Sequence, residues 1–145
     1  LIKSNSYLEG VTIGENCNIG PSARLRPNST VAQNSKIGNF VEIKNSNIGK
    51  NTSIAHLSYV GDAKVGNNVN IGAGTITCNY DGKSKHKTTI KDNVFIGSNS
   101  SLIAPLILES NSKIGAGSVI TKNIPKNSLA IERSDLKILR NKRVK

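Results

Sequence analysis

A six-residue repeat runs through most of this chain and limits what it can fold into. Aliphatic residues recur every six positions, apart from short slips in phase, and a small or β-branched residue follows four positions after most of them. A period of six matches neither an α-helix nor a simple amphipathic strand. The aliphatic residues in this phase are Leu1, Ile13, Ile19, Leu25, Val31, Ile37, Ile43, Ile48, Ile54, Val60, Val65, Ile71, Ile90, Ile96, Leu102, Leu108, Ile114 and Ile120.

The repeat predicts an all-β chain wound as a triangular coil, in which each unit forms one short side and one corner. The aliphatic and small residues point inward and stack on their copies in neighbouring coils, while glycine and asparagine supply the positive φ that corners need. About 20 units at three per coil build about six to seven coils, and a strand spacing of about 4.8 Å makes the prism about 30 Å long. This fold is the hexapeptide parallel β-helix.

The phase breaks by more than one residue at a single place. Thr77 and Ile90 stand thirteen positions apart where six would suffice, so seven extra residues must leave the prism. We place this loop insertion at residues 78–89, around the segment 79–87. Loops carried on a rigid scaffold often hold functional residues, although a tolerated insertion is the plain alternative.

The repeat fades after Ile120. We therefore expect residues 1–133 to form the β-helix domain, and residues 134–145 to form a short helix capped by Ser134 with a basic tail. The chain contains no methionine and opens inside the repeat, so we expect it to be the C-terminal fragment of a longer protein.

The composition of the chain limits the kinds of partner that it could bind. The formal net charge is +11, yet aromatic residues make up only 3% of the chain, so the aromatic interleaving that stacks nucleic-acid bases is missing. The longest apolar run, 102–108, is too short to cross a membrane and contains Pro105. Two cysteines, Cys17 and Cys78, are too few for a disulfide framework, which favours a reduced, cytoplasmic compartment. We expect neither a nucleic-acid nor a membrane partner.

Two outward cations point to an anion site. Arg26 and Lys44 each follow an aliphatic repeat residue, and three repeat units, which make one coil, separate them along the chain. We expect them to stack about 5 Å apart on one edge, with Gly61 leaving space on the next coil. Stacked cations repel unless an anion lies between them, which indicates a phosphate or carboxylate site. A solvated cationic face is the alternative.

The two histidines differ in their surroundings. His56 is expected at an outward corner that flanks this cationic edge, whereas His86 lies in the loop and is taken as incidental. Glu42, close to Lys44, could orient a histidine or neutralise the lysine, and an ordinary surface ion pair fits the spacing equally well. Two histidines cannot form a three-histidine zinc site and the sequence shows no cluster with metal-ligand spacing, so no metal is expected in this domain.

Several segments together resemble one enzyme family. The most specific is the run GNNVNIGAGTITCNYDG at 66–82, preceded by Gly61-Asp62-Ala63 and supported by segments 23–27, 38–42 and 130–133. From about Ile19 to Arg133 the chain resembles the C-terminal acetyltransferase domains of the bacterial bifunctional GlmU family. That family joins a glucosamine-1-phosphate N-acetyltransferase to an N-acetylglucosamine-1-phosphate uridylyltransferase.

The resemblance implies a fold, an assembly and a reaction. The coil would wind left-handed, and three copies would form a homotrimer with acetyl-CoA sites between subunits. Acetyl-CoA would acetylate glucosamine-1-phosphate, giving N-acetylglucosamine-1-phosphate for UDP-N-acetylglucosamine and thus for peptidoglycan and lipopolysaccharide, in the bacterial cytoplasm. The N-terminal uridylyltransferase domain, with its Mg²⁺ site, is absent from this chain.

Roles carry over by position. His56 matches the family's catalytic histidine. The positions that match sugar-phosphate contacts are Arg26, Lys44, Tyr59 and Asn70. The positions that match acetyl-CoA contacts are Ala73, Asn79, Tyr80, Ser98, Ala116 and Arg133, and Lys85 is expected to join them.

The residue chemistry agrees with such a reaction. A protonated sugar amine cannot attack a thioester, so a base is needed, and a histidine side chain ordinarily titrates near 6.5. We expect His56 to take the proton, with Glu42 as its orienting partner, and the amine to attack directly without an acyl-enzyme. Backbone N–H groups or the Asn79 amide would stabilise the oxyanion.

Two other readings remain open at this point. One is a different hexapeptide acyltransferase acting on serine, a sialic-acid-type sugar or an acyl carrier protein, and the pair Arg26 and Lys44 favours a phosphorylated acceptor over these. The other is a non-catalytic β-helical scaffold, of which ice-binding proteins are one example. Those proteins need flat arrays of threonine, whereas the outward positions here are irregular and charged.

Overall fold

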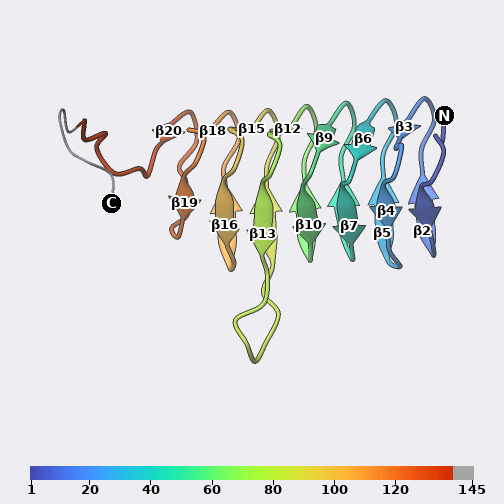
Figure 1. The fold of residues 1–145 in the computed structure, drawn as a ribbon, viewed down its shortest axis with the longest axis horizontal. Coiled ribbons are helices and arrows are strands. Elements are labelled where there is room, and N and C mark those ends of the chain that lie inside the picture. Colours follow the sequence, from blue (N-terminus) through green and yellow to red (C-terminus); the bar gives the residue numbers. More distant parts are fainter. Residues whose placement is uncertain (139–145) are drawn as a thin grey trace, which may run out of the picture.

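The chain forms a straight triangular prism of stacked coils. The computed structural model describes residues 1–138, in which twenty short strands make three parallel sheets, one on each side of the prism (Figure 1). Together with the hexapeptide repeat, this arrangement is the left-handed parallel β-helix that the resemblance implies. Within these residues no helix has the length and apolar character that a membrane crossing requires.

Each sheet takes every third strand of the chain. The first sheet holds β1 (Tyr7–Leu8), β4 (Arg24–Leu25), β7 (Glu42–Lys44), β10 (Tyr59–Gly61), β13 (Ile76–Cys78), β16 (Ser101–Ile103) and β19 (Val119–Ile120). The second holds β2 (Val11–Ile13), β5 (Ser29–Val31), β8 (Asn47–Ile48), β11 (Ala63–Val65), β14 (Thr88–Ile90) and β17 (Leu106–Leu108). The third holds β3 (Asn18–Ile19), β6 (Lys36–Asn39), β9 (Ser53–His56), β12 (Asn70–Ile71), β15 (Phe95–Ile96), β18 (Lys113–Ile114) and β20 (Leu129–Ala130).

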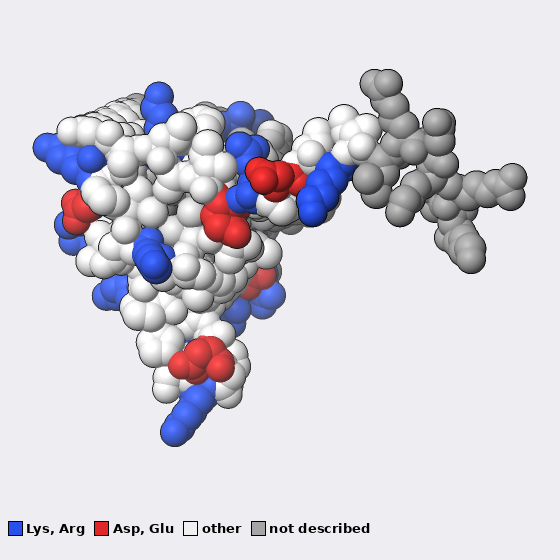
Figure 2. Space-filling model, turned by 90° about the vertical axis from the view of Figure 1, so that its left-hand side faces the viewer, with Lys and Arg blue, Asp and Glu red and all other residues white. Residues whose placement is uncertain are grey.

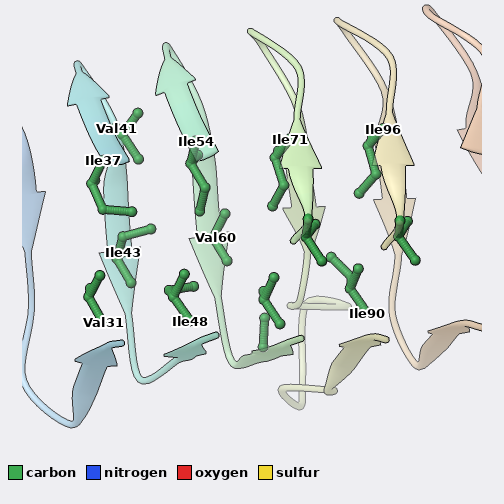
Figure 3. Close-up of a cluster of buried hydrophobic side chains, with 14 of the residues drawn as sticks. Val31, Ile37, Val41, Ile43, Ile48, Ile54, Val60, Ile71, Ile90 and Ile96 are labelled. Atoms are coloured by element: carbon green, nitrogen blue, oxygen red, sulfur yellow. The ribbon is translucent and has the colours of Figure 1, made fainter. Parts of the chain in front are cut away.

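The aliphatic repeat residues form the core, as predicted. From Ile19 to Ile120 every one of them is buried, and they stack in columns along the prism (Figure 3). The small residues predicted to point inward are buried as well, among them Ser35 and Thr52. Leu1 keeps the phase but is exposed, at the N-terminal end of the described coils.

Asparagine makes one corner of the prism. Many corner residues have positive φ, and most of those that are not glycine are asparagine, which tolerates this conformation. At one corner the side-chain amides also form a ladder, each donating to the next coil over 3.0–3.2 Å; its members are Asn51, Asn68, Asn93, Asn111 and Asn127. The asparagine-rich composition is therefore a requirement of the corner.

The predicted loop leaves the prism between β13 and β14. Ile76 pairs with Ser101, whereas Glu42 pairs with Tyr59, so the coil that contains the loop uses more of the chain than an ordinary coil does. The loop segment 79–87, which contains the extra residues, projects from one edge (Figure 1), and an isolated antiparallel bridge joins Tyr80 to Lys85. Viewed along the prism axis, the projecting part carries side chains of both charges (Figure 2).

The predicted C-terminal helix is wrong over the part that the structure describes. Residues 134–138 have no helical structure, and the remainder of the expected helix and tail, 139–145, lies outside the described residues. Leu136 is 87% exposed, so no apolar face packs against the prism there. A short helix without such packing is only marginally stable.

Candidate functional site

A cavity of about 390 Å³ opens where the loop meets the corner between the first and second sheets. Its lining is rich in charged and amide side chains: Arg26, Pro27, Asn28, Lys44, Asn45, Asp62 and Lys85. Three of these residues are cations and one is an acid. The cavity is therefore suited to a small anion.

The predicted stack of Arg26 and Lys44 is confirmed. The backbone N–H of Arg26 donates to Ile43 over 2.8 Å, which places Arg26 one coil below Lys44, and Lys44 pairs with Gly61 one coil above. The stack differs from the prediction in one respect, because the protein itself supplies carboxylates. Arg26 lies 3.0 Å from Glu42, and Lys44 lies 3.2 Å from Asp62.

Asp62 organises the floor of the cavity. It is only 8% exposed, and its carboxylate accepts hydrogen bonds from Lys44, from Asn45 at 2.6 Å and from the Asn79 amide. Burial alone would raise the pKa of Asp62, but these three donors outweigh burial and hold the pKa below its usual value. The sequence analysis did not predict a role for Asp62 or Asn45. The sequence signal that could have identified them is that they are two polar residues at corners one coil apart.

Lys85 brings a third cation from the loop. Its ammonium approaches that of Lys44, and this contact with a like charge lowers the pKa of Lys85. The pKa of Lys44 is raised, because the Asp62 carboxylate accepts a hydrogen bond from its ammonium and stabilises the charged form. Lys85 was predicted to join the acetyl-CoA contacts, but in this chain it lies in the cavity with Arg26 and Lys44.

The Tyr59 side chain packs closely against Gly61. A Cβ atom at Gly61 would stand only 2.6 Å from Cζ and 2.8 Å from Cε1 of the Tyr59 ring. The phenol therefore uses the space that the missing side chain leaves. Its hydroxyl accepts a 3.4 Å hydrogen bond from Asn79, so Tyr59 is connected to the Asp62 network.

The Asn79 side chain was predicted to help stabilise the oxyanion, but in the structure it binds two other side chains. It is 8% exposed, and its amide nitrogen donates to both Asp62 and Tyr59. Both of its N–H groups are thereby used, so the predicted donation to an oxyanion does not fit this arrangement. Neighbouring Tyr80 is exposed, and its hydroxyl donates to the Gly82 carbonyl over 2.7 Å.

His56 ends β9 on the far side of β10 from the cavity. Its Nδ1 lies 2.7 Å from Oδ1 of Asn39, which ends β6 and pairs with His56 in the sheet register. The prediction that Glu42 orients His56 is wrong, because Glu42 pairs with Arg26 and, more loosely, with Arg24 at 3.9 Å. Asn39 was missed, although its position one coil before His56 in the repeat was a usable signal.

The predicted acetyl-CoA positions form a column that starts at His56. The register of β9, β12, β15 and β18 stacks His56, Ala73, Ser98 and Ala116 on consecutive coils. Backbone hydrogen bonds of 2.8 Å from the next residues, Asn99 to Ala73 and Gly117 to Ser98, hold this corner. On the next coil the register of β18 and β20 places Glu132 in this column, and Arg133 follows it, with its Cδ 4.0 Å from the site of a Cβ on Gly117.

Neither Asn70 nor His86 lines the cavity. Asn70 lies in β12 on the third sheet and is not among the residues that line the cavity. No group of three or more His, Cys, Asp or Glu side chains in residues 1–138 is placed to hold a metal ion. His86, taken as incidental, lies 2.6 Å from Asp81 within the loop.

The fold and its repeat define a β-helical protein of the hexapeptide type, and comparison with known families agrees. The family model of the GMPPB C-terminal domain matches residues 7–80, and the model of the bacterial transferase hexapeptide, with six repeats, matches residues 87–122. The chain belongs to the family that the GMPPB C-terminal domain model describes. It also closely resembles the C-terminal acetyltransferase domain of GlmU, as the curated relatives indicate.

Two of these relatives, both named "Bifunctional protein GlmU", illustrate the match. The protein from Marinobacter nauticus is 58% identical over 132 residues, which are 91% of this chain and 29% of that protein. The protein from Saccharophagus degradans is 60% identical over 129 residues, which are 89% of this chain and 29% of that protein. The chain thus spans less than a third of the length of either relative.

Solved structures share the fold at low sequence identity. A perosamine N-acetyltransferase mutant from Caulobacter crescentus, in complex with CoA and GDP-perosamine, has a TM-score of 0.61 and 19% identity over 88% of this chain and 53% of that one. The polySia-specific acetyltransferase NeuO has a TM-score of 0.63 and 20% identity over 97% of this chain and 87% of that one.

Proposed function

We propose that this chain transfers the acetyl group of acetyl-CoA to the amine of glucosamine-1-phosphate. The observation that carries the proposal is the convergence of three cations, Arg26, Lys44 and Lys85, on one cavity beside the strand that His56 precedes. The product, N-acetylglucosamine-1-phosphate, serves UDP-N-acetylglucosamine synthesis, and hence peptidoglycan and lipopolysaccharide. The high identity to proteins named GlmU supports this choice of acceptor.

The cavity holds the sugar phosphate. Arg26 and Lys44 are each balanced by a carboxylate, so Lys85 adds an unbalanced positive charge close to Lys44. A phosphate dianion between these groups relieves their repulsion and accepts their hydrogen bonds. Lys85 accordingly belongs to the sugar-phosphate subsite in this proposal, while Tyr59 and Asn70 contact the sugar.

His56 acts as general base. Its Nε2 takes a proton as the sugar amine attacks the thioester carbon, and the resulting tetrahedral oxyanion is stabilised by backbone N–H groups. Collapse breaks the carbon–sulfur bond, the amide forms, and the proton passes from the imidazolium to the departing thiolate to give free coenzyme A. No acyl-enzyme is formed, because the cavity and base bring the amine directly to the thioester.

The column above His56 guides acetyl-CoA. Over three coils this corner carries only small side chains, those of Ala73, Ser98 and Ala116. Arg133 lies at the far end of the column. With about 4.8 Å per coil, His56 and the Arg133 end lie about 19 Å apart, a length that the extended arm of coenzyme A can follow. Arg133 would then meet the phosphates of the coenzyme, and Tyr80 the acetyl end.

The functional unit in this proposal is a homotrimer with acetyl-CoA between subunits. Phe40 and Leu57 stand beside Asn39 and His56 with their side chains 62% and 61% exposed. Both have positive φ, at 55° and 51°, which is strained for bulky residues. Burial of these side chains against a second copy would compensate the cost of that strain and would enclose the base.

Residues 1–133, with the loop at 78–89, form the acetyltransferase domain in this proposal. Uridylyl transfer and its Mg²⁺ are not expected of these residues. Both substrates are metabolites of the bacterial cytoplasm, so the proposal places the protein there.

The test is thiol release from acetyl-CoA, with and without glucosamine-1-phosphate. We expect release that depends on the phosphorylated sugar and falls about 10²–10⁴-fold in His56→Ala. His86→Gln is the matched control and should keep wild-type turnover. Equal release with unphosphorylated glucosamine or serine would refute the phosphate subsite, and normal turnover in His56→Ala would refute the base.

A further inference from the structure

The hydrogen bond between Asn39 and His56 defines the chemical form of the imidazole. Asn39 ends β6 and His56 ends β9, and the two residues are direct partners in the parallel ladder. The atoms that meet are Oδ1 of Asn39 and Nδ1 of His56, 2.7 Å apart. A carbonyl oxygen only accepts hydrogen bonds, so Nδ1 must carry the hydrogen.

The surrounding backbone holds this pair in place. The N–H of Leu57 donates to the carbonyl of Asn39 over 3.0 Å, which ties the residue that follows β9 to the end of β6. Gly38 lies so close to the Ala55 backbone that a side chain there would collide with it. Asn39 is therefore carried by a tightly packed ladder of two strands, and not by a mobile loop.

We propose that Asn39 is a positioning residue that locks His56 in the tautomer protonated on Nδ1. The inference rests on the proposed role of His56 as base. With the hydrogen on Nδ1, the lone pair lies on Nε2, the nitrogen that faces away from Asn39 and is free to take the amine proton. Without Asn39, neutral imidazole redistributes toward the form with hydrogen on Nε2, which cannot act as a base at that atom.

An amide suits this task better than a carboxylate. A carboxylate at Nδ1 would stabilise the imidazolium as well as set the tautomer, whereas a neutral oxygen sets the tautomer without adding a negative charge beside the ring. The nearby carboxylate that could have served, Glu42, is held by Arg26 at 3.0 Å. The division of partners thus keeps a formal charge away from the base.

The direct test is nitrogen NMR of histidine-labelled full chain above pH 8. The chain has only two histidines, so His86→Gln identifies the signals of His56. We expect His56 to show a protonated Nδ1 in the wild type, a shift toward protonated Nε2 in Asn39→Ala, and the wild-type form in Asn39→Asp. Asn18→Ala, an exposed strand asparagine on the same sheet, is the matched control and should leave the spectrum unchanged.

Kinetics provide the second arm. Asn39→Ala should lower kcat at least tenfold with both KM values unchanged, because a misdirected base slows only the proton transfer. Asn39→Asp should recover most of the rate, with the acidic limb of its pH profile moved to higher pH. A wild-type His56 protonated on Nε2, or an Asn39→Ala enzyme with wild-type kcat, overturns the inference. The NMR readout needs no substrate, so it decides the tautomer even where the proposed acceptor is wrong.

Discussion

Gly61→Ala should weaken sugar-phosphate binding by displacing Tyr59. The added methyl would lie 2.6 Å from Cζ and 2.8 Å from Cε1 of the ring, whereas carbon atoms pack comfortably at about 3.5–4.0 Å. The backbone tolerates alanine, because Gly61 lies in β10 without positive φ and its N–H is held by Thr77 over 2.8 Å. The ring must therefore move by roughly 1 Å.

The expected magnitude follows from the lost hydrogen bond. The contact of the Tyr59 hydroxyl with Asn79 is already 3.4 Å long and will not survive the shift, so the hydroxyl leaves its place beside the cavity. A hydrogen bond to a charged ligand is worth about 1.5–3 kcal/mol, which raises the KM for the sugar phosphate about tenfold to 150-fold. The KM for acetyl-CoA should not change, because the coenzyme column lies on another edge.

A double-mutant cycle tests this reasoning by initial rates at saturating acetyl-CoA. Tyr59→Phe alone should raise the KM for the sugar phosphate to a similar degree, and adding Gly61→Ala to it should have little further effect. Additive effects would show that Gly61 acts through something other than the hydroxyl. A Gly61→Ala enzyme with wild-type KM would refute the proposed geometry outright.

Two stability predictions follow from the buried polar groups and the corner ladder. Because the pKa of Asp62 is held below its ordinary value of 3.8, its contribution to stability is present above about pH 4 and is lost as pH falls through the folded-state pKa. Between pH 5 and pH 2 the urea midpoint of the wild type should therefore fall more than that of Asp62→Asn. Asn93→Ala loses two ladder hydrogen bonds and places alanine at φ 58°, and should lose about 2 kcal/mol in urea unfolding. Asn93→Gly, which keeps the φ, should lose about half as much.

Each of these two predictions would be contradicted by a specific result. Parallel pH dependence of wild type and Asp62→Asn would show that the carboxylate is not held more tightly in the folded state. If Asn93→Gly were as unstable as Asn93→Ala, positive φ would contribute nothing at that corner and the ladder would carry the whole effect.

The arrangement of the site depends on the coil more than on any single motif. One turn of the prism brings residues from consecutive coils into direct contact, as with Asn39 and His56, or Lys44 and Gly61. The strand β10 separates the proposed base from the cationic cavity by only a short stretch of chain. A rigid coil thereby holds two long cationic side chains and a base in fixed relation, and the loop adds Lys85 as the third cation.

The sequence by itself determined the fold, because the period of six leaves a chain one way to bury its aliphatic residues. It also determined the stack of Arg26 on Lys44 and the place of the loop, since both follow from counting residues along the coil. Its periodicity could not show the partners of these groups, because several polar side chains lie within reach of each cation and each histidine nitrogen.

Only the tertiary structure decided those partners. In the structure Glu42 pairs with Arg26, Asn39 lies against His56, and the Asn79 amide donates a hydrogen bond to Asp62. It also brought Lys85 into the cavity, because the path of a loop is not set by the repeat. Hydrogen-bond partners depend on side-chain directions and distances of a few tenths of an ångström, and a pattern of residue types along the chain does not contain that information.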